Sequence, residues 1–174
     1  DPRLIVPINM EMPKGAQGYH VFEIKDKKIM VANVCTEAFM HNIIKNPLDV
    51  SNELKDVASD IKIIDLHGEA TAEKVAYLHY FKKDFTGIFG THTHVQTADE
   101  DVFDGCAYIT DVGMCGAYES IIGRDIDEVL SRMIDNKVTH YTVSKGEPVF
   151  SAVVVEVSGE TNRALNIERI QIRP

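Results

Sequence analysis

The sequence has few cysteines, and none of them is spaced as a metal clip or a redox motif. Three cysteines occur among the 174 residues, and no two form a C-x-x-C pair. An odd number without such spacing indicates free thiols in a reducing compartment, which favours a cytoplasmic protein. We expect Cys35, Cys106 and Cys115 to behave as small buried hydrophobic residues.

Long apolar runs are also missing. No stretch approaches the ~18 apolar residues that a membrane-crossing helix needs, so no membrane partner is expected. The first residues contain no basic region followed by an apolar one, which excludes a secretory signal in this stretch. The chain begins without Met and reaches the strand-like run LIVPI at once, as is typical of the middle of a protein.

Basic residues are fewer than acidic residues. Eighteen Lys and Arg face 27 Asp and Glu, which gives a formal net charge of −9. This balance argues against general binding to nucleic acid, although a metal ion could still bring a phosphate ester to an acidic protein. The length and the absence of repeats, low-complexity segments and linkers predict a single domain over residues 1–174.

Strand and helix patterns alternate through the middle of the chain, and strands follow to its end. The predicted class is therefore α/β with a mixed sheet or a sheet sandwich. Strands are expected within 19–34, 61–66, 85–90 and 106–110, with antiparallel strands from 140 onward. Helices are expected at 51–59 with Ser51 as N-cap, after His67-Gly68-Glu69 with Val75, Ala76, Leu78 and Phe81 inward, and at 125–136 with Ile126, Val129, Leu130 and Met133 inward.

The residues able to do chemistry follow three of these strands. The first loop carries His67 and Glu69, the second is Gly90-Thr91-His92-Thr93-His94, and the third begins at Asp111. In α/β folds, ligands gather beyond the carboxyl ends of the strands. If the second loop stays extended, His92 and His94 point to the same side, where two imidazoles could bind one metal.

His67 lies 25 residues before His92, which leaves room for one helix and one returning strand between neighbouring parallel strands. Three histidines from two strand ends make a strong metal-site candidate, although paired loop histidines without a metal remain an alternative. Glu69 is expected to orient a histidine or to bond the N-terminus of the next helix. Asp111 is a similar supporting candidate, and the glycine loop after it could either cradle a phosphate or form a simple turn.

The stretches DLHGEATAEK, GTHTHVQTADE and AYITDVGMCG, in this order and spacing, closely resemble the bacterial calcineurin-like metallophosphoesterases called YmdB-like. Further upstream, RLIVPINM and AFMHNIIKNPLDV also look like this family. The resemblance covers nearly the whole chain. It implies an α/β sandwich of mixed β-sheets flanked by helices, here lacking the first strands.

The resemblance also implies an activity and a ligand set. The activity is hydrolysis of phosphodiesters, with the cyclic nucleotides 2′,3′-cAMP and 3′,5′-cAMP as substrates, by a hydroxide that two metal ions activate. The ions are expected to be iron or manganese, with magnesium or zinc as alternatives. His67, His92 and His94 match the family's three metal-binding histidines.

The family's earlier motifs are not found in these 174 residues: an Asp on the opening strand, a Glu-Asn pair, and an Asn-His pair that supplies the proton donor. We therefore expect the chain to be the C-terminal portion of the domain, without a catalytic proton donor of its own. Sheet edges left uncovered in this way favour a homo-oligomer.

Two alternatives remain. One is a metal-binding or assembly fragment without turnover. The other is a metal-dependent amidohydrolase, whose barrel needs about 250 residues, mostly after the H-x-H motif.

Overall fold

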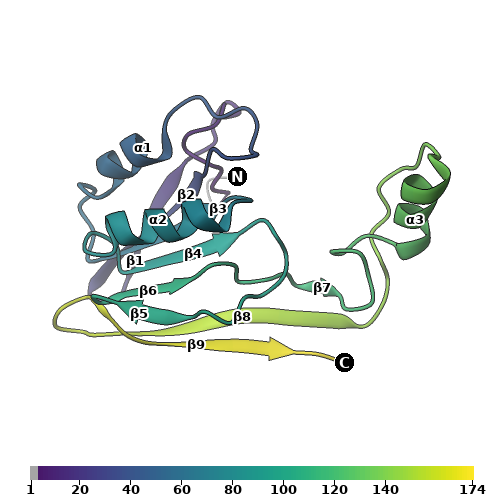
Figure 1. The fold of residues 1–174 in the computed structure, drawn as a ribbon. Helices are drawn as coiled ribbons and strands as arrows, with labels where there is room; N and C mark the ends of the chain where they lie inside the picture. The colour runs from purple at the N-terminus through teal and green to yellow at the C-terminus, as the bar shows by residue number, and fades with distance from the viewer. Residues whose placement is uncertain (1–3) are drawn as a thin grey trace.

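The computed structural model describes residues 4–174, and Figure 1 shows its arrangement. The first half of the chain forms β1 (Tyr19–Ile24), β2 (Lys27–Cys35), α1 (Pro47–Leu54), β3 (Ile61–His67), α2 (Thr71–Phe81) and β4 (Gly87–Thr91). The second half forms β5 (Asp101–Phe103), β6 (Cys106–Ile109), β7 (Gly116–Ala117), α3 (Ile126–Asp135), β8 (Pro148–Val157) and β9 (Ala164–Ile172).

The strands form two sheets. Six of them make a mixed sheet in the order β1-β2-β3-β4-β6-β5, and β7, β8 and β9 make an antiparallel sheet. Strands β2, β3, β4 and β6 run parallel, so their carboxyl ends meet at one edge of the sheet. The predicted α/β class with a mixed sheet is confirmed, and an open sheet of this order differs from the closed barrel of an amidohydrolase.

The core has two layers of side chains, one on each face of the six-stranded sheet. On one face the sheet packs against α1 and α2 through buried residues that include Ile64, Leu78 and Phe81. On the other face, Phe89 and Ala107 pack against Ile167 of β9. This arrangement is a sandwich of helices, sheet and second sheet, and the carboxyl edge of the parallel strands stays free to carry loops (Figure 1).

Helix α1 begins earlier than its sequence pattern suggested. Asn46 is the N-cap, because its side chain accepts a hydrogen bond from Leu48 N, and Pro47 stands in the first turn. Proline is well suited to this place because the first turn needs no amide donor. The prediction of Ser51 as N-cap is therefore wrong: Ser51 is buried within the helix, 2.5 Å from the hydroxyl of Tyr77.

Two predicted apolar faces also need correction. Ala76 of α2 is exposed, and the buried positions of this helix include Lys74 and Tyr77. Only Val129 is buried in α3, whereas Ile126, Leu130 and Met133 are exposed. These three side chains do not turn inward because α3 belongs to a segment that projects from the sandwich (Figure 1). This segment, residues 118–147 between β7 and β8, is called the arm below.

The predicted strand from residue 140 onward starts later than expected. Residues 140–147 contain only an isolated bridge between Val143 and Arg124, and β8 begins at Pro148. Strands β8 and β9 then form the expected antiparallel pair around the turn that contains Gly159. Strand β5, which the sequence analysis did not anticipate, has only three residues.

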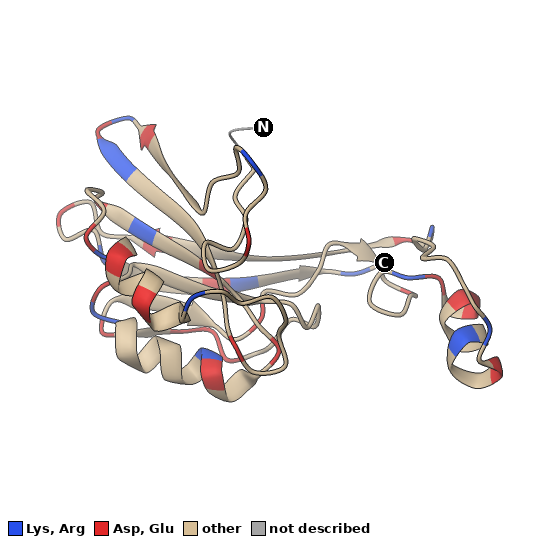
Figure 2. Ribbon diagram, turned by 90° about the horizontal axis from the view of Figure 1, so that it is seen from above, with Lys and Arg blue, Asp and Glu red and all other residues tan. Residues whose placement is uncertain are grey.

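Among the described residues, no helix combines the length and apolar character needed to cross a membrane. Figure 2 shows acidic and basic residues interspersed along the ribbon, with both signs on the arm that carries α3. Arg124 and Glu128 pair there at 2.7 Å.

Candidate metal centre

The candidate site lies at the shared carboxyl edge of the parallel strands. His67 is the last residue of β3 and Thr91 the last of β4, and the sheet register pairs these two residues directly. The loop from His92 to His94 continues from β4, and Asp111 follows β6. The three loops singled out from the sequence therefore meet in space because their strands are hydrogen-bonded neighbours.

The imidazoles of His67 and His92 are in contact. His67 Nε2 lies 3.1 Å from His92 Nδ1, and the two ring planes stand 85° apart. On the other side of its ring, His92 Nε2 lies 3.1 Å from Glu69 Oε2. The predicted proximity of His67 to His92 is confirmed, and Glu69, expected to support the site, contacts His92.

A hydrogen-bonded chain behind His67 selects its tautomer. The Thr91 hydroxyl donates to Asp65 Oδ1 at 2.7 Å, so its oxygen is left to accept from His67 Nδ1, 3.1 Å away. Asp65 in turn accepts a hydrogen bond from the side-chain amide of Asn33 at 2.8 Å. His67 therefore carries its hydrogen on Nδ1, and the lone pair of Nε2 faces His92.

The surroundings of His67 also favour the uncharged form of its ring by lowering its pKa. Burial is the main cause that lowers the pKa of His67, and the nearby charges of His92 and Lys74 lower it further, against an opposing effect of Asp65. A neutral imidazole is the form that binds a metal ion. Burial raises the pKa of Asp65, since its carboxylate is also partly removed from water.

The second loop is not extended, so the condition under which His92 and His94 would point to the same side is not met. Its histidines both have left-handed backbone conformations, with φ of 105° at His92 and 68° at His94. Such angles are uncommon for residues with a side chain and often mark functional sites. His94 is exposed, and within residues 4–174 no group of three or more His, Cys, Asp or Glu side chains is already gathered as a metal site.

Two glycines allow the loops to approach so closely. A Cβ atom on Gly90 would lie 1.7 Å from Thr110 O, and a Cβ on Gly68 would lie 2.1 Å from Thr36 Oγ1. Both distances are far below van der Waals contact. Glycine is therefore required in HGE and in GTHTH because atoms of a neighbouring segment pass directly over it.

The carboxylate of Asp111 joins the second and third loops through hydrogen bonds. Its Oδ2 accepts hydrogen bonds from Thr93 N at 2.9 Å and Thr93 Oγ1 at 2.8 Å, and its Oδ1 accepts from Gly113 N at 2.9 Å. The Val112 amide donates to Gly90 O at 2.9 Å. Two amides of the glycine loop are thus engaged within the protein, which favours a turn over a phosphate cradle.

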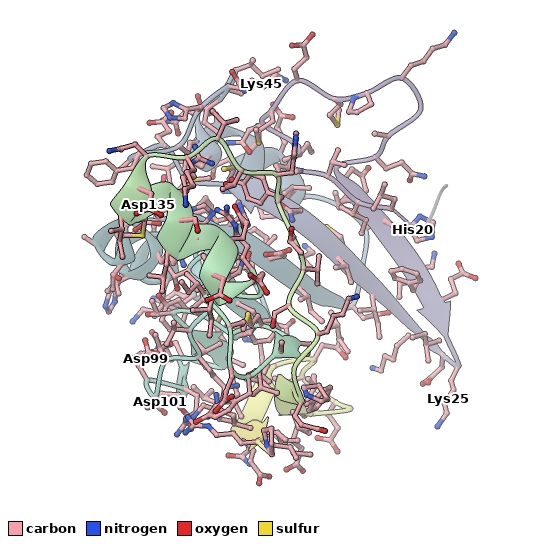
Figure 3. All side chains as sticks on the ribbon, turned by 90° about the vertical axis from the view of Figure 1, so that its right-hand side faces the viewer. His20, Lys25, Lys45, Asp99, Asp101 and Asp135 are labelled. Atoms are coloured by element: carbon pink, nitrogen blue, oxygen red, sulfur yellow. The ribbon has the colours of Figure 1, made fainter. Side chains whose placement is uncertain are left out.

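The remaining histidines are dispersed. His20 lies on β1 at the sheet edge opposite Asp101 of β5, as Figure 3 shows, whereas His41, His79 and His140 are exposed. Three further residues surround the site and were not predicted from the sequence: Thr91, Asp65 and Lys74. Thr91 could have been found from the register of β3 against β4, and Lys74 from its i, i+4 and i+7 spacing with Leu78 and Phe81.

Comparison with known proteins places this arrangement in a family. The sequence profile described as YmdB-like protein matches residues 1–170. The chain belongs to the YmdB-like family. A curated Bacillus subtilis (strain 168) relative, named 2′,3′-cyclic-nucleotide 2′-phosphodiesterase, is 36% identical over 98% of this chain and 66% of its own length.

Two solved structures have the same fold. A structure described as a novel phosphatase of Mycoplasma pneumoniae is 35% identical, with a TM-score of 0.89 over 99% of this chain and 64% of that one. A hypothetical protein of Thermus thermophilus is 29% identical, with a TM-score of 0.88 over 97% of this chain and 66% of that one. The YmdB-like chain described here thus spans just under two thirds of the length of these relatives.

The donor set suits a metal ion of the kind the family resemblance implies. His67 presents Nε2 beside Nδ1 of His92, and the Glu69 carboxylate lies at Nε2 on the other side of the His92 ring. Imidazole and carboxylate ligands fit manganese, iron and zinc. His94 is exposed, and its role as a third ligand stays a prediction.

Proposed function

We propose that the protein is a metal-dependent phosphodiesterase that acts on small phosphodiesters, with 2′,3′-cAMP and 3′,5′-cAMP as the substrates of first choice. The observation that carries this proposal is the 3.1 Å contact between His67 Nε2 and His92 Nδ1 at the edge where ligands bind in α/β folds. Membership of the YmdB-like family and the name of the Bacillus subtilis relative support it.

We assign His67, His92 and His94 as metal ligands, with manganese or iron as the expected ions. When bound, two such ions supply Lewis-acid activation of water and of the phosphoryl group. The chain's own residues prepare the site. Asp65 and Thr91 hold His67 in the tautomer that leaves Nε2 free, and Glu69 orients His92.

The activity is tested on the protein as its gene encodes it, with bis-p-nitrophenyl phosphate and 2′,3′-cAMP in the presence of Mn²⁺. We expect hydrolysis of both esters, loss of activity in excess EDTA, and recovery when Mn²⁺ is returned. His140→Ala is the matched control because His140 is exposed and lies outside the three loops of the candidate site. A protein that binds Mn²⁺ but hydrolyses neither ester would instead be a metal-binding module without turnover.

A second role, assembly with another copy of the chain, is favoured by the arm. Its exposed apolar side chains include Met133 at 72%, Tyr141 at 76% and Val138 at 97% exposure. An apolar surface on a projecting segment is typical of protein interfaces. We therefore propose a homo-oligomer, which is compatible with phosphodiesterase activity.

A further inference from the structure

Lys74 is the most unusual residue near the site, because a lysine is rarely buried completely. It lies on α2, on the face that packs against the sheet, and its exposed fraction is 0%. Removing an ammonium group from water is costly unless partners replace the water. The neighbours of Lys74 therefore indicate what its charge does.

The ammonium group of Lys74 has three partners. Nζ donates to Thr91 O at 2.8 Å and to Thr110 O at 3.1 Å, and it lies 3.4 Å from Asp111 Oδ2. Thr91 ends β4 immediately before His92, and Thr110 follows β6 immediately before Asp111. One side chain therefore joins the ends of two neighbouring strands at the point where each becomes a loop of the candidate site.

The same contacts continue to the histidine loop. Asp111 Oδ2, the oxygen that faces Lys74, also accepts the hydrogen bonds from Thr93 N and Thr93 Oγ1. Thr93 stands between His92 and His94, whose backbones have the uncommon left-handed conformation. The path from Lys74 through Asp111 to Thr93 thus ends at the residue that separates the two histidines.

We propose that Lys74 and Asp111 form a buried ion pair that positions His92 and His94 for metal binding. Lys74 fixes the carbonyl before His92, and Asp111 fixes the amide between the two histidines. Neither residue is a metal ligand, and both act by holding the strained loop in one conformation. This inference rests on the proposed metal site and extends it to two residues outside the ligand set.

A competing effect predicts the opposite change in metal affinity, so an experiment can distinguish the two. The charge of Lys74 lies close enough to His67 to lower the pKa of that ring, so a cation beside the site could also repel a metal ion. If repulsion were the stronger effect, removal of the charge would tighten metal binding. If positioning is the stronger effect, removal loosens it.

The test measures Mn²⁺ affinity of the complete protein by competition with a fluorescent chelator, alongside urea unfolding. Lys74→Met keeps an unbranched side chain that is one atom shorter and removes the charge and its donors. Leu78→Ala is the matched control: Leu78 is buried on the same face of α2 but packs in the apolar core rather than against the loops. Loss of hydrogen-bonded groups that support ligands typically lowers metal affinity about 10- to 100-fold, and this range is expected for Lys74→Met.

Thr93→Val provides a second, milder test that does not disturb the core. It removes the hydroxyl that donates to Asp111, and a several-fold weaker affinity is expected with an unchanged unfolding midpoint. The inference is supported if both variants bind Mn²⁺ more weakly while Leu78→Ala, although destabilised, binds it as the wild type does.

Three results would overturn the inference. One is wild-type affinity in both Lys74→Met and Thr93→Val. Another is tighter binding in Lys74→Met, and the third is an equal loss of affinity in Leu78→Ala. If the wild-type protein did not bind Mn²⁺, the proposed metal site would be overturned as well. If the wild-type protein binds Mn²⁺ and one of the three results above is found, only the role of Lys74 and Asp111 is overturned.

Discussion

At the scale of single residues, close packing decides which side chains the sheet edge tolerates. Gly90 lies in β4 beneath the Thr110 carbonyl, where a Cβ atom would lie 1.7 Å from the oxygen. Gly159, in the turn between β8 and β9, has no atom within 4 Å of the same position. The two glycines therefore form a matched pair for substitution.

Gly90→Ala is expected to destabilise the protein strongly, because the backbone of β4 and β6 must separate to admit the methyl group. Overpacking costs about 1–3 kcal/mol in a side-chain core, and a clash with backbone is at the upper end or beyond. Urea unfolding measures the effect. Gly159→Ala should change the free energy of unfolding by less than about 0.5 kcal/mol, as is usual for an open surface position; equal effects of the two substitutions would contradict the close approach.

The cysteines give a second prediction at this scale. All three are free, Cys35 and Cys106 are buried, and Cys115 is exposed, so the expectation of three buried thiols is wrong for Cys115. Burial, assisted by the charges of Glu73 and Asp65, raises the pKa of Cys35 to about 11. Burial also raises the pKa of Cys106 to about 12.

Because the thiolate is the reactive form, native protein at pH 8 should react with iodoacetamide at Cys115 alone. A thiol with a pKa near 11 is ionised in only about one molecule in a thousand at that pH, and burial further blocks access. Peptide mass spectrometry should find one modified cysteine in the native protein and three in urea. Rapid native modification of Cys106 would contradict the buried position of β6.

At the scale of elements, α1 shows how a local signal can be misplaced. Taken alone, the pair Asn46-Pro47 indicates a break, because the residue before a proline avoids the helical conformation. That restriction holds, since Asn46 is extended, with ψ of 133°, and caps the helix that starts at Pro47. The same observation therefore marks the beginning of a helix, and only the position of Val50 and Leu54 against the sheet distinguishes the two interpretations.

Asn46→Ala should destabilise the protein by about 0.5–2 kcal/mol, because the amide of Leu48 loses its acceptor. Asn46→Gly should cost only a few tenths of a kcal/mol, since an uncapped glycine leaves the amide open to water. Thermal unfolding of both variants compares them. Ser51→Ala alters the residue that the sequence predicted to be the cap, and it acts through the buried contact with Tyr77 instead. A cap at position 46 is therefore recognised by a larger loss of stability in Asn46→Ala than in Asn46→Gly.

At the scale of the whole molecule, the sequence indicated the parallel strands and the loops that end them, because short apolar runs followed by His67, Gly90 and Asp111 are local signals. The contact of His67 with His92 followed from the strand order. The left-handed conformations of His92 and His94 did not, since the residues that contact their loop, Asp111 and, through it, Lys74, come from other parts of the sequence. The exposed face of α3 was equally unpredictable, because an amphipathic pattern does not reveal which surface covers it.

The exposed apolar side chains of the arm lead us to predict that the protein self-associates. Val138→Asp and Met133→Asp place charges on its exposed apolar surface, and we expect both to shift the protein toward monomer in sedimentation velocity. Ile44→Asp is the control, because Ile44 is 62% exposed on the body of the molecule, away from the arm. A wild-type protein that sediments as a monomer over the micromolar range would contradict self-association through the arm.

The central claim is that the carboxyl edge of the parallel sheet binds metal through His67, His92 and His94. Its most direct measurement is anomalous X-ray scattering from crystals of the complete protein grown with Mn²⁺. We predict an anomalous peak within coordination distance of His67 Nε2 and His92, with His94 turned toward the same region. Strong manganese peaks elsewhere in the molecule, with His67 Nε2 still 3.1 Å from His92 Nδ1, would contradict the claim.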